Sequence, residues 1–124
     1  GKTAVRKIYR DHTGKEHSAF VFGEPKESAN VRFNNVSTDI ELLSNEEKFT
    51  SLIRSVDLLS RDGGVMVFVD ASHPHSTEVK EFGVGAQILS LLGIKRINLL
   101  THSKNKAFVG LSGFGLCIDN QVEV

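Results

Sequence analysis

The stretch VMVFVDASHPHSTEVKEFGVGAQILSLLGIKRINLL, residues 65–100, decides the fold. It opens with five consecutive apolar residues, Val65–Val69, which is the pattern of a strand covered on both faces. A helix is predicted to begin near Ser76 or Thr77 and to run to Leu92, and Ile94–Leu100 is predicted to be a second buried strand. The order strand, helix, strand predicts an α/β layer with parallel or mixed strands.

The residues before this stretch predict an antiparallel beginning. Apolar and polar residues alternate in Ala4–Tyr9 and again in His17–Phe22, and Asp11–Lys15 between them has the composition of a turn. These segments predict a hairpin. Asn30–Asn34 is predicted to be a third strand, whereas Asp39–Leu43 is ambiguous.

A first helix and a last strand complete the expected elements. Ser44 and Glu47 have the spacing of a capping box, so the helix is expected to begin at Ser44, and Asp62–Gly64 is expected to end it. A short helix is expected at Lys106–Leu111 and a strand at Leu116–Ile118. The sequence thus predicts an α/β fold with α+β features, in which an antiparallel N-terminal hairpin precedes a β-α-β-α-β mixed sheet.

Composition bounds the function. The chain has 124 residues, expected to form one domain over 1–124, and 40% of them are apolar. Fifteen basic and fifteen acidic residues give no net charge, which argues against binding to a nucleic-acid polymer, and no apolar run is long enough to cross a membrane. The single cysteine, Cys117, excludes an internal disulfide, predicts a cytoplasmic location and has the pattern of a core thiol.

Two polar loops are candidate sites, because each follows the carboxyl end of a predicted strand. In the first loop, Asp70, His73 and His75 could form a two-histidine, one-carboxylate metal site, although a solvated loop is favoured because no further strong ligand is near in the sequence. In the second, Thr101 and Lys106 could bind a phosphate or nucleotide, against the plainer interpretation of a polar connection.

The glycines of Gly83-Val84-Gly85-Ala86 are expected to serve helix packing, since this segment lies within the predicted helix and lacks the features of a phosphate-binding loop. The chain also begins at Gly1 without a methionine, which suggests a part of a longer protein.

Several segments, in the same order along the chain, resemble the motifs of one family. They are Gly14–Val21, Val31-Arg32, Phe82–Leu89, Leu92–Ile94, Leu99–Thr101, Lys106 and Val109–Leu116. These segments resemble the GTP cyclohydrolase II family of riboflavin biosynthesis, in which an aromatic-Gly-Ile-Gly-Ala-Gln-Ile-Leu segment leads to Leu-Leu-Thr and then to a Lys followed by Gly-Leu-x-Gly-x-Gly. The resemblance implies a GTP cyclohydrolase II-like fold and keeps Thr101 and Lys106 as phosphate contacts.

The sequence departs from the family's pattern at the residues that carry the family's activity. The family holds a catalytic zinc with three cysteines, but residues 31–60 here contain no cysteine and no histidine, so no zinc and no other cofactor is expected. The family's purine-binding segment after the central strand is missing. Its Asp-x-Arg, where the arginine is the nucleophile, is replaced by Glu78-Val79-Lys80, which leaves Glu78 and Lys80 as vestigial candidates.

The resemblance also implies that the domain is part of a longer protein with a second activity. In many bacteria the family's domain follows 3,4-dihydroxy-2-butanone 4-phosphate synthase in one chain. We therefore expect a domain without cyclohydrolase activity that acts as a scaffold, dimerisation or regulatory unit beside that N-terminal synthase, which would make the full-length protein an enzyme. A homodimer is expected by analogy. The alternatives are a zinc-independent nucleotide or phosphate-ester hydrolase, using Glu78, Lys80 and Lys106, and a module that binds GTP or a phosphorylated metabolite.

Overall fold

The computed structural model describes residues 4–11, 13–24, 26–35, 39–69, 78–101 and 115–124, without the side chains of residues 35, 39, 41, 42 and 78–82. Its elements, in chain order, are β1 (Ala4–Arg10), β2 (Glu16–Phe22), β3 (Ser28–Asn35), α1 (Asp39–Ser44), α2 (Glu46–Asp62), β4 (Gly64–Val69), α3 (Glu78–Leu91), β5 (Arg96–Thr101) and β6 (Cys117–Glu123). The expected helix at 106–111 lies outside the described residues.

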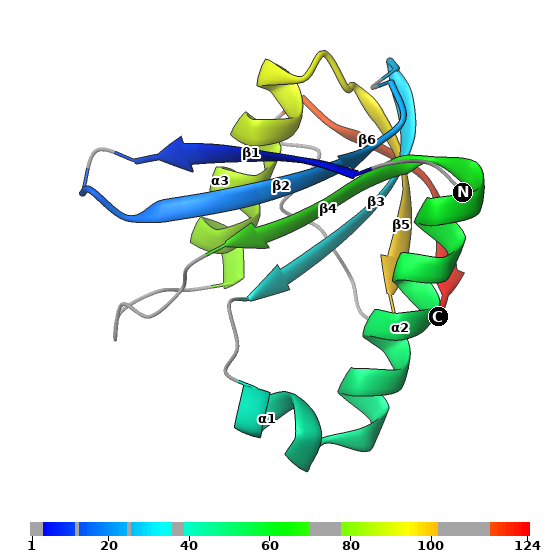
Figure 1. The fold of residues 1–124 in the computed structure, drawn as a ribbon. Coiled ribbons are helices and arrows are strands. Elements are labelled where there is room, and N and C mark those ends of the chain that lie inside the picture. The colour runs from blue at the N-terminus through cyan, green and yellow to red at the C-terminus, as the bar shows by residue number, and fades with distance from the viewer. Residues whose placement is uncertain (1–3, 12, 25, 36–38, 70–77, 102–114) are drawn as a thin grey trace.

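The six strands form one sheet in the order β1-β2-β4-β3-β5-β6 (Figure 1). β1 and β2 form the predicted antiparallel hairpin, and β2 runs antiparallel to β4. β4, β3, β5 and β6 are mutually parallel. The predicted mixed α/β sheet is therefore confirmed, with the hairpin joined to β4 and not to the strand that follows it in the chain.

The two longer helices pack on opposite faces of the sheet. On the α3 face, the alternate residues Val65, Val67 and Val69 of β4 form one apolar cluster with Ala86 and Leu89. On the α2 face, Met66 forms a second cluster with Phe22, Leu59 and Leu100. β4 is buried on both sides, as its uninterrupted apolar sequence predicts.

The middle of α3, at Gly85, packs closely on the sheet. A Cβ atom on Gly85 would overlap the ring of Phe33 in β3, so only glycine allows this approach. The sequence-based interpretation of Gly85 as a packing residue is confirmed.

The predicted cap of α2 is wrong by one residue. The N-cap is Asn45, whose Oδ1 accepts the N–H of Lys48 at 3.0 Å. Ser44 ends α1 instead, and its hydroxyl donates to the carbonyl of Ile40 at 2.7 Å. The predicted end is confirmed, because Gly63 caps the helix with φ 85° and its N–H donates to Leu59 O at 2.8 Å.

Candidate functional site

The side chains of most site residues predicted from the sequence lie outside the described part of the structure. Asp70, His73, His75 and Lys106 lie outside the described residues. Glu78 and Lys80 lie in the first turn of α3, with only their backbone described. The metal, hydrolase and phosphate sites built on these six residues stay predictions.

Thr101 is the one predicted site residue whose side chain is described. It is half-buried at the end of β5, and its carbonyl accepts the N–H of Val124 at 3.0 Å. Residues alternate across a strand, so Thr101 shares the α3 face with Leu99, while Leu100 belongs to the α2 face. Thr101 is therefore placed at the expected sheet edge.

A buried arginine on the α2 face is the polar group that the sequence analysis did not single out. Arg32, in β3, is 8% exposed. Its Nη1 donates to the hydroxyls of Ser51 and Ser55 on α2, at 2.5 and 3.0 Å. Its Nε donates to Asn34 Oδ1 at 2.7 Å. A signal was present, since two serines four residues apart share a helix face that could meet a polar residue of the sheet.

This arrangement has more hydrogen-bond donors than acceptors. Burial lowers the pKa of Arg32, but a guanidinium remains charged at neutral pH. Among the residues that the structure describes, no carboxylate lies within ion-pair distance of Arg32. The Nδ2 of Asn34 is buried and, within the same residues, has no acceptor. The chemistry that suits such a cluster is the binding of an anion or another oxygen acceptor.

An open cleft of about 450 Å³ lies at the amino-terminal ends of β3 and β4, at the edge of the sheet opposite to the one where Thr101 lies. Asparagine side chains line part of it and form a ladder across the strands. Asn120 Nδ2 donates to Asn98 Oδ1 at 3.2 Å, Asn98 Nδ2 to Asn30 Oδ1 at 3.1 Å, and Asn30 Nδ2 to the carbonyl of Gly63 at 3.2 Å. Their amides are mostly engaged with one another, which indicates a structural role.

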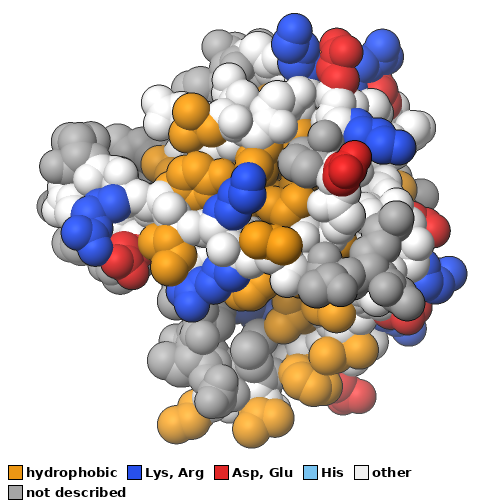
Figure 2. All heavy atoms as spheres, turned by 45° about the horizontal axis from the view of Figure 1, so that its top comes forward, with side chains coloured by type: hydrophobic (Ala, Val, Ile, Leu, Met, Phe, Trp, Pro, Cys, Tyr) orange, Lys and Arg blue, Asp and Glu red, His pale blue; other side chains and the backbone are white. Residues whose placement is uncertain are grey.

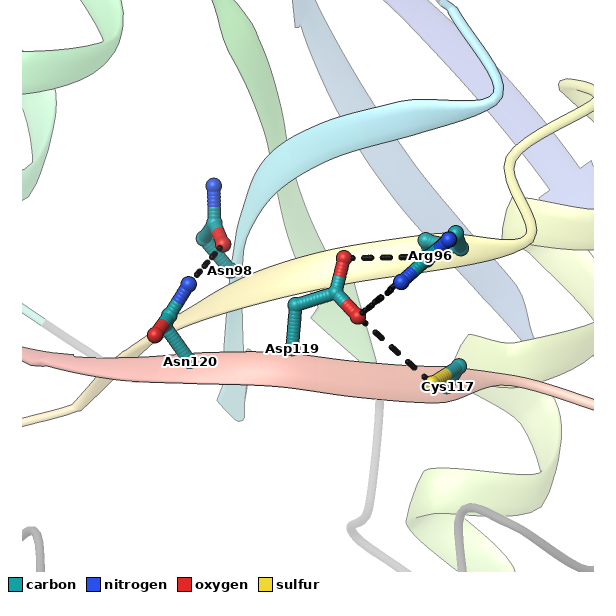
Figure 3. A network of polar contacts seen from close by, with 5 residues as sticks. All are labelled: Arg96, Asn98, Cys117, Asp119 and Asn120. Atoms are coloured by element: carbon teal, nitrogen blue, oxygen red, sulfur yellow. Dashed lines mark hydrogen bonds and ion pairs between the residues drawn. The ribbon is translucent and has the colours of Figure 1, made fainter.

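The outer pair of strands, β5 and β6, carries an ion pair beside the single cysteine (Figure 3). Arg96 Nη2 lies 2.9 Å from Asp119 Oδ1, and the guanidinium lowers the pKa of that carboxyl. The thiol of Cys117 donates to the same carboxylate at 3.6 Å. Cys117 is exposed, so its expected place in the core is wrong. β6 is an edge strand, which leaves this side chain uncovered.

A buried histidine closes the β1–β2 hairpin. His17 is 3% exposed, and its Nε2 lies 2.8 Å from Asp11 Oδ2. The other oxygen of Asp11 accepts the N–H of Thr13 and of Lys15, at 2.8 and 3.1 Å, and also the Thr13 hydroxyl. The hydrogen bonds from Thr13 and His17 hold the pKa of Asp11 well below its usual range. The pair orders a turn.

Two general properties bear on the site. Within the described ranges, no three His, Cys, Asp or Glu side chains are grouped so that they could hold a metal ion. Within the same ranges, no helix combines the length and apolar character needed to span a membrane.

The chain is similar to proteins of riboflavin biosynthesis. It is 42% identical over its whole length to a 3,4-dihydroxy-2-butanone 4-phosphate synthase of Sulfurospirillum multivorans, and 41% identical over 94% of its length to that of Campylobacter jejuni. It spans only 35% and 34% of those two proteins. A 42-residue part, 34% of this chain, is 48% identical to 10% of the riboflavin biosynthesis protein RibBA of Porphyromonas gingivalis.

Among solved structures, an esterase aligns over 81% of this chain and 34% of its own, with 17% identity and a TM-score of 0.42, which is too low to support a conclusion. The family model of GTP cyclohydrolase II matches residues 69–123, from the end of β4 to the end of β6. The chain thus carries a GTP cyclohydrolase II sequence pattern in its second half and has homologues in riboflavin biosynthesis.

Proposed function

We propose that this chain is a GTP cyclohydrolase II-like domain of riboflavin biosynthesis that has no cyclohydrolase activity of its own. It acts as a scaffold, dimerisation or regulatory unit beside a 3,4-dihydroxy-2-butanone 4-phosphate synthase. The observation that carries the proposal is the position of the only cysteine. Cys117 begins β6, whereas residues 31–60, where the resemblance places the zinc ligands, contain neither cysteine nor histidine.

The geometry supports a loss of the zinc site. β3, β5 and β6 are parallel, and Cys117 is paired with Arg96, the first residue of β5. Cys117 therefore lies at the amino-terminal edge of the sheet, about 20 Å, or one strand length, from the carboxyl edge where β3 ends. A catalytic zinc needs about three protein ligands around one point. One thiol at the opposite edge cannot replace three at the end of β3.

The place of Arg32 also supports a structural use of this region. Val31-Arg32 resembles the family's strand that leads to the metal. Here the guanidinium is turned toward α2 and bonded to Ser51 and Ser55. The polar contact between β3 and α2 thus joins two elements of the fold.

The names and lengths of the relatives support the choice of partner. The two relatives compared over nearly the whole chain are named 3,4-dihydroxy-2-butanone 4-phosphate synthase, and about two thirds of their length lies outside the match. We assign the synthase activity to that remaining part, and we expect the domain to accompany it in one polypeptide.

The test is a turnover assay on the purified, folded chain with GTP, with and without added zinc and magnesium. An active GTP cyclohydrolase II serves as the positive control. We expect neither pyrophosphate nor a ring-opened product, because no zinc-bound water is available to attack the purine. Product formation that depends on this chain would overturn the proposal.

A second candidate, a module that binds a phosphorylated metabolite, is favoured by the donor-rich cluster of Arg32 and Asn34. Calorimetric titration with GTP and with pyrophosphate tests it. Saturable binding without turnover, lost in Asn34→Ala and kept in Asn98→Ala, would support this function. Asn98 is the matched control because it is also a strand asparagine on the α2 face but belongs to the ladder. Binding that survives Asn34→Ala would exclude this cluster as the site.

A further inference from the structure

Helix α2 packs on the sheet through both apolar and polar residues, and part of its apolar surface faces solvent. Ser51 and Ser55 are 2% and 0% exposed on the inner face. Phe49, Ile53 and Val56 are 41%, 51% and 38% exposed. The spacing of these three places them on one stripe of the helix surface, as i, i+4 and i+7 residues always are. Leu59 of the same helix is fully buried against the sheet, so these three apolar residues form a second apolar surface that the sheet does not cover.

The neighbouring helix α1 extends this apolar surface. Ile40 and Leu43 are each 77% exposed, and α1 contacts α2. Among the described residues, five of the eight exposed large hydrophobic side chains belong to these two helices. Figure 2 shows hydrophobic side chains gathered in the lower part of the view, where Figure 1 places α1 and α2. We call the five residues the α1–α2 patch: Ile40, Leu43, Phe49, Ile53 and Val56.

Clustered apolar side chains of this kind mark a contact surface more often than isolated ones do. The relatives indicate what covers the patch, since about two thirds of their polypeptide lies outside the part that matches this chain. We propose that the α1–α2 patch is the surface on which the synthase part of a longer polypeptide packs. This inference rests on the proposed function.

Both ends of the described chain lie beside α2, which suits such an arrangement. Ala4 is paired with Phe22, and Phe22 with Gly64, which follows the residue that caps α2. At the other end, Val124 packs on the apolar cluster that contains Leu59 of α2. Figure 1 marks the C-terminus next to this helix. A domain joined at either end would therefore emerge within reach of the patch.

The border of the patch indicates the chemistry of its partner. Helical geometry places Glu46 and Asp57 beside the apolar stripe, and both side chains are exposed. The Asp57 carboxylate is 3.5 Å from Arg61, one turn further along, in an exposed pair that holds it weakly. The complementary surface is thus an apolar groove with basic side chains at its rim.

The experiment compares two forms of this chain by hydrogen–deuterium exchange. One is the 124-residue chain alone, and the other is the same chain joined to the part of the Sulfurospirillum multivorans synthase outside its match to this chain. The inference predicts that the exposed side of α2 becomes protected in the joined protein. It also predicts that Ile53→Glu removes this protection and lowers the affinity of the separately expressed parts about tenfold or more.

Ile8→Glu is the matched control, because Ile8 is 55% exposed but lies in β1, at the opposite side of the hairpin from β4. It should leave the protection of α2 unchanged. Protection that Ile53→Glu and Ile8→Glu reduce equally would overturn the inference, and so would protection that appears in the isolated chain as it dimerises, which would assign the patch to a second copy.

Failure of the inference can be separated from failure of the proposed function. If the joined chain raises the thermal stability or activity of the synthase part while α2 stays unprotected, the scaffold function stands and the docking surface lies elsewhere. If the chain changes neither property and α2 is unprotected, both are overturned.

Discussion

At the scale of single residues, the structure contains a charge that its own sheet and helix do not neutralise. Arg32 is nearly fully buried and donates only to neutral oxygens of Ser51, Ser55 and Asn34 among the described residues. Hydrogen bonds from a charged donor are about twice as strong as neutral ones, so they can offset part of the cost of burial. β3 and α2 are thereby joined by a polar contact inside an apolar interface.

We predict that Arg32→Ala lowers the free energy of unfolding by about 2 to 4 kcal/mol, because it leaves a cavity and buried polar groups without partners. Urea denaturation measures this loss. Arg61→Ala, which removes an exposed ion pair with Asp57, is the control and should change the stability by no more than about 0.5 kcal/mol. A loss below about 1 kcal/mol for Arg32→Ala would show that the contact is not a structural one.

At this scale, the sequence predicted the position of a residue along its strand better than it predicted whether the side chain is buried. Thr101 was placed correctly at a strand end, because a hydroxyl after an apolar run is a local feature. The burial of Arg32 and the exposure of Cys117 were not anticipated. Both depend on which strand lies at the edge and which lies under a helix, and such neighbours are set by contacts between distant parts of the chain.

At the scale of helices and strands, local signals predicted most elements and failed where two signals competed. Ser44 and Asn45 both have the chemistry of an N-cap. The hydroxyl of Ser44 is used by the last turn of α1, so Asn45 caps α2. Asp39–Leu43 was ambiguous because a six-residue helix is too short to show a clear period. By contrast, the hairpin and β4 were predicted from alternation and from an unbroken apolar run.

Two glycines offer a prediction at this scale. Both have positive φ, 88° at Gly14 and 140° at Gly64. Nothing lies within 4 Å of a Cβ at Gly14, whereas a Cβ at Gly64 would overlap the backbone carbonyl of Asn30 and lie 2.6 Å from Leu59 Cδ2. We expect Gly14→Ala to cost about 1 kcal/mol and Gly64→Ala about 3 kcal/mol or more.

Chemical denaturation of both variants provides the measurement, and Gly14→Ala is the control for backbone strain without a clash. Equal losses would mean that the junction of α2 and β4 can move away from β3. In that case the close approach at Gly64 would not fix the position of the helix.

At the scale of the whole molecule, the sheet joins an antiparallel hairpin to a parallel layer through the β2–β4 pair. The sequence indicated both parts but not their junction, because strand order is decided by packing and not by period. The predicted polar edge of the sheet is consistent with the parallel strands. The serine pair of α2 was a local signal for a polar contact, but its partner, Arg32, could be identified only once the helix was placed over β3.

This organisation predicts a gradient of local stability. β4 has strands on both sides and is buried on both faces, while β1 is an edge strand whose side chains are almost all exposed. By hydrogen exchange, β4 amides should open only with global unfolding, and the β1 amides that face away from β2 should exchange with little protection. Strong protection of the whole of β1 in the isolated chain would reveal another strand paired with this edge.

The asparagine ladder has one further consequence, which concerns direction. Every amide in it donates the same way, from Asn120 through Asn98 and Asn30 to the carbonyl at the end of α2. The Gly63 carbonyl can only accept, so Asn30 must turn its Nδ2 toward it, and each amide then fixes the orientation of the next one. An edge strand and a helix terminus three strands away are therefore linked by one line of hydrogen bonds that all point the same way.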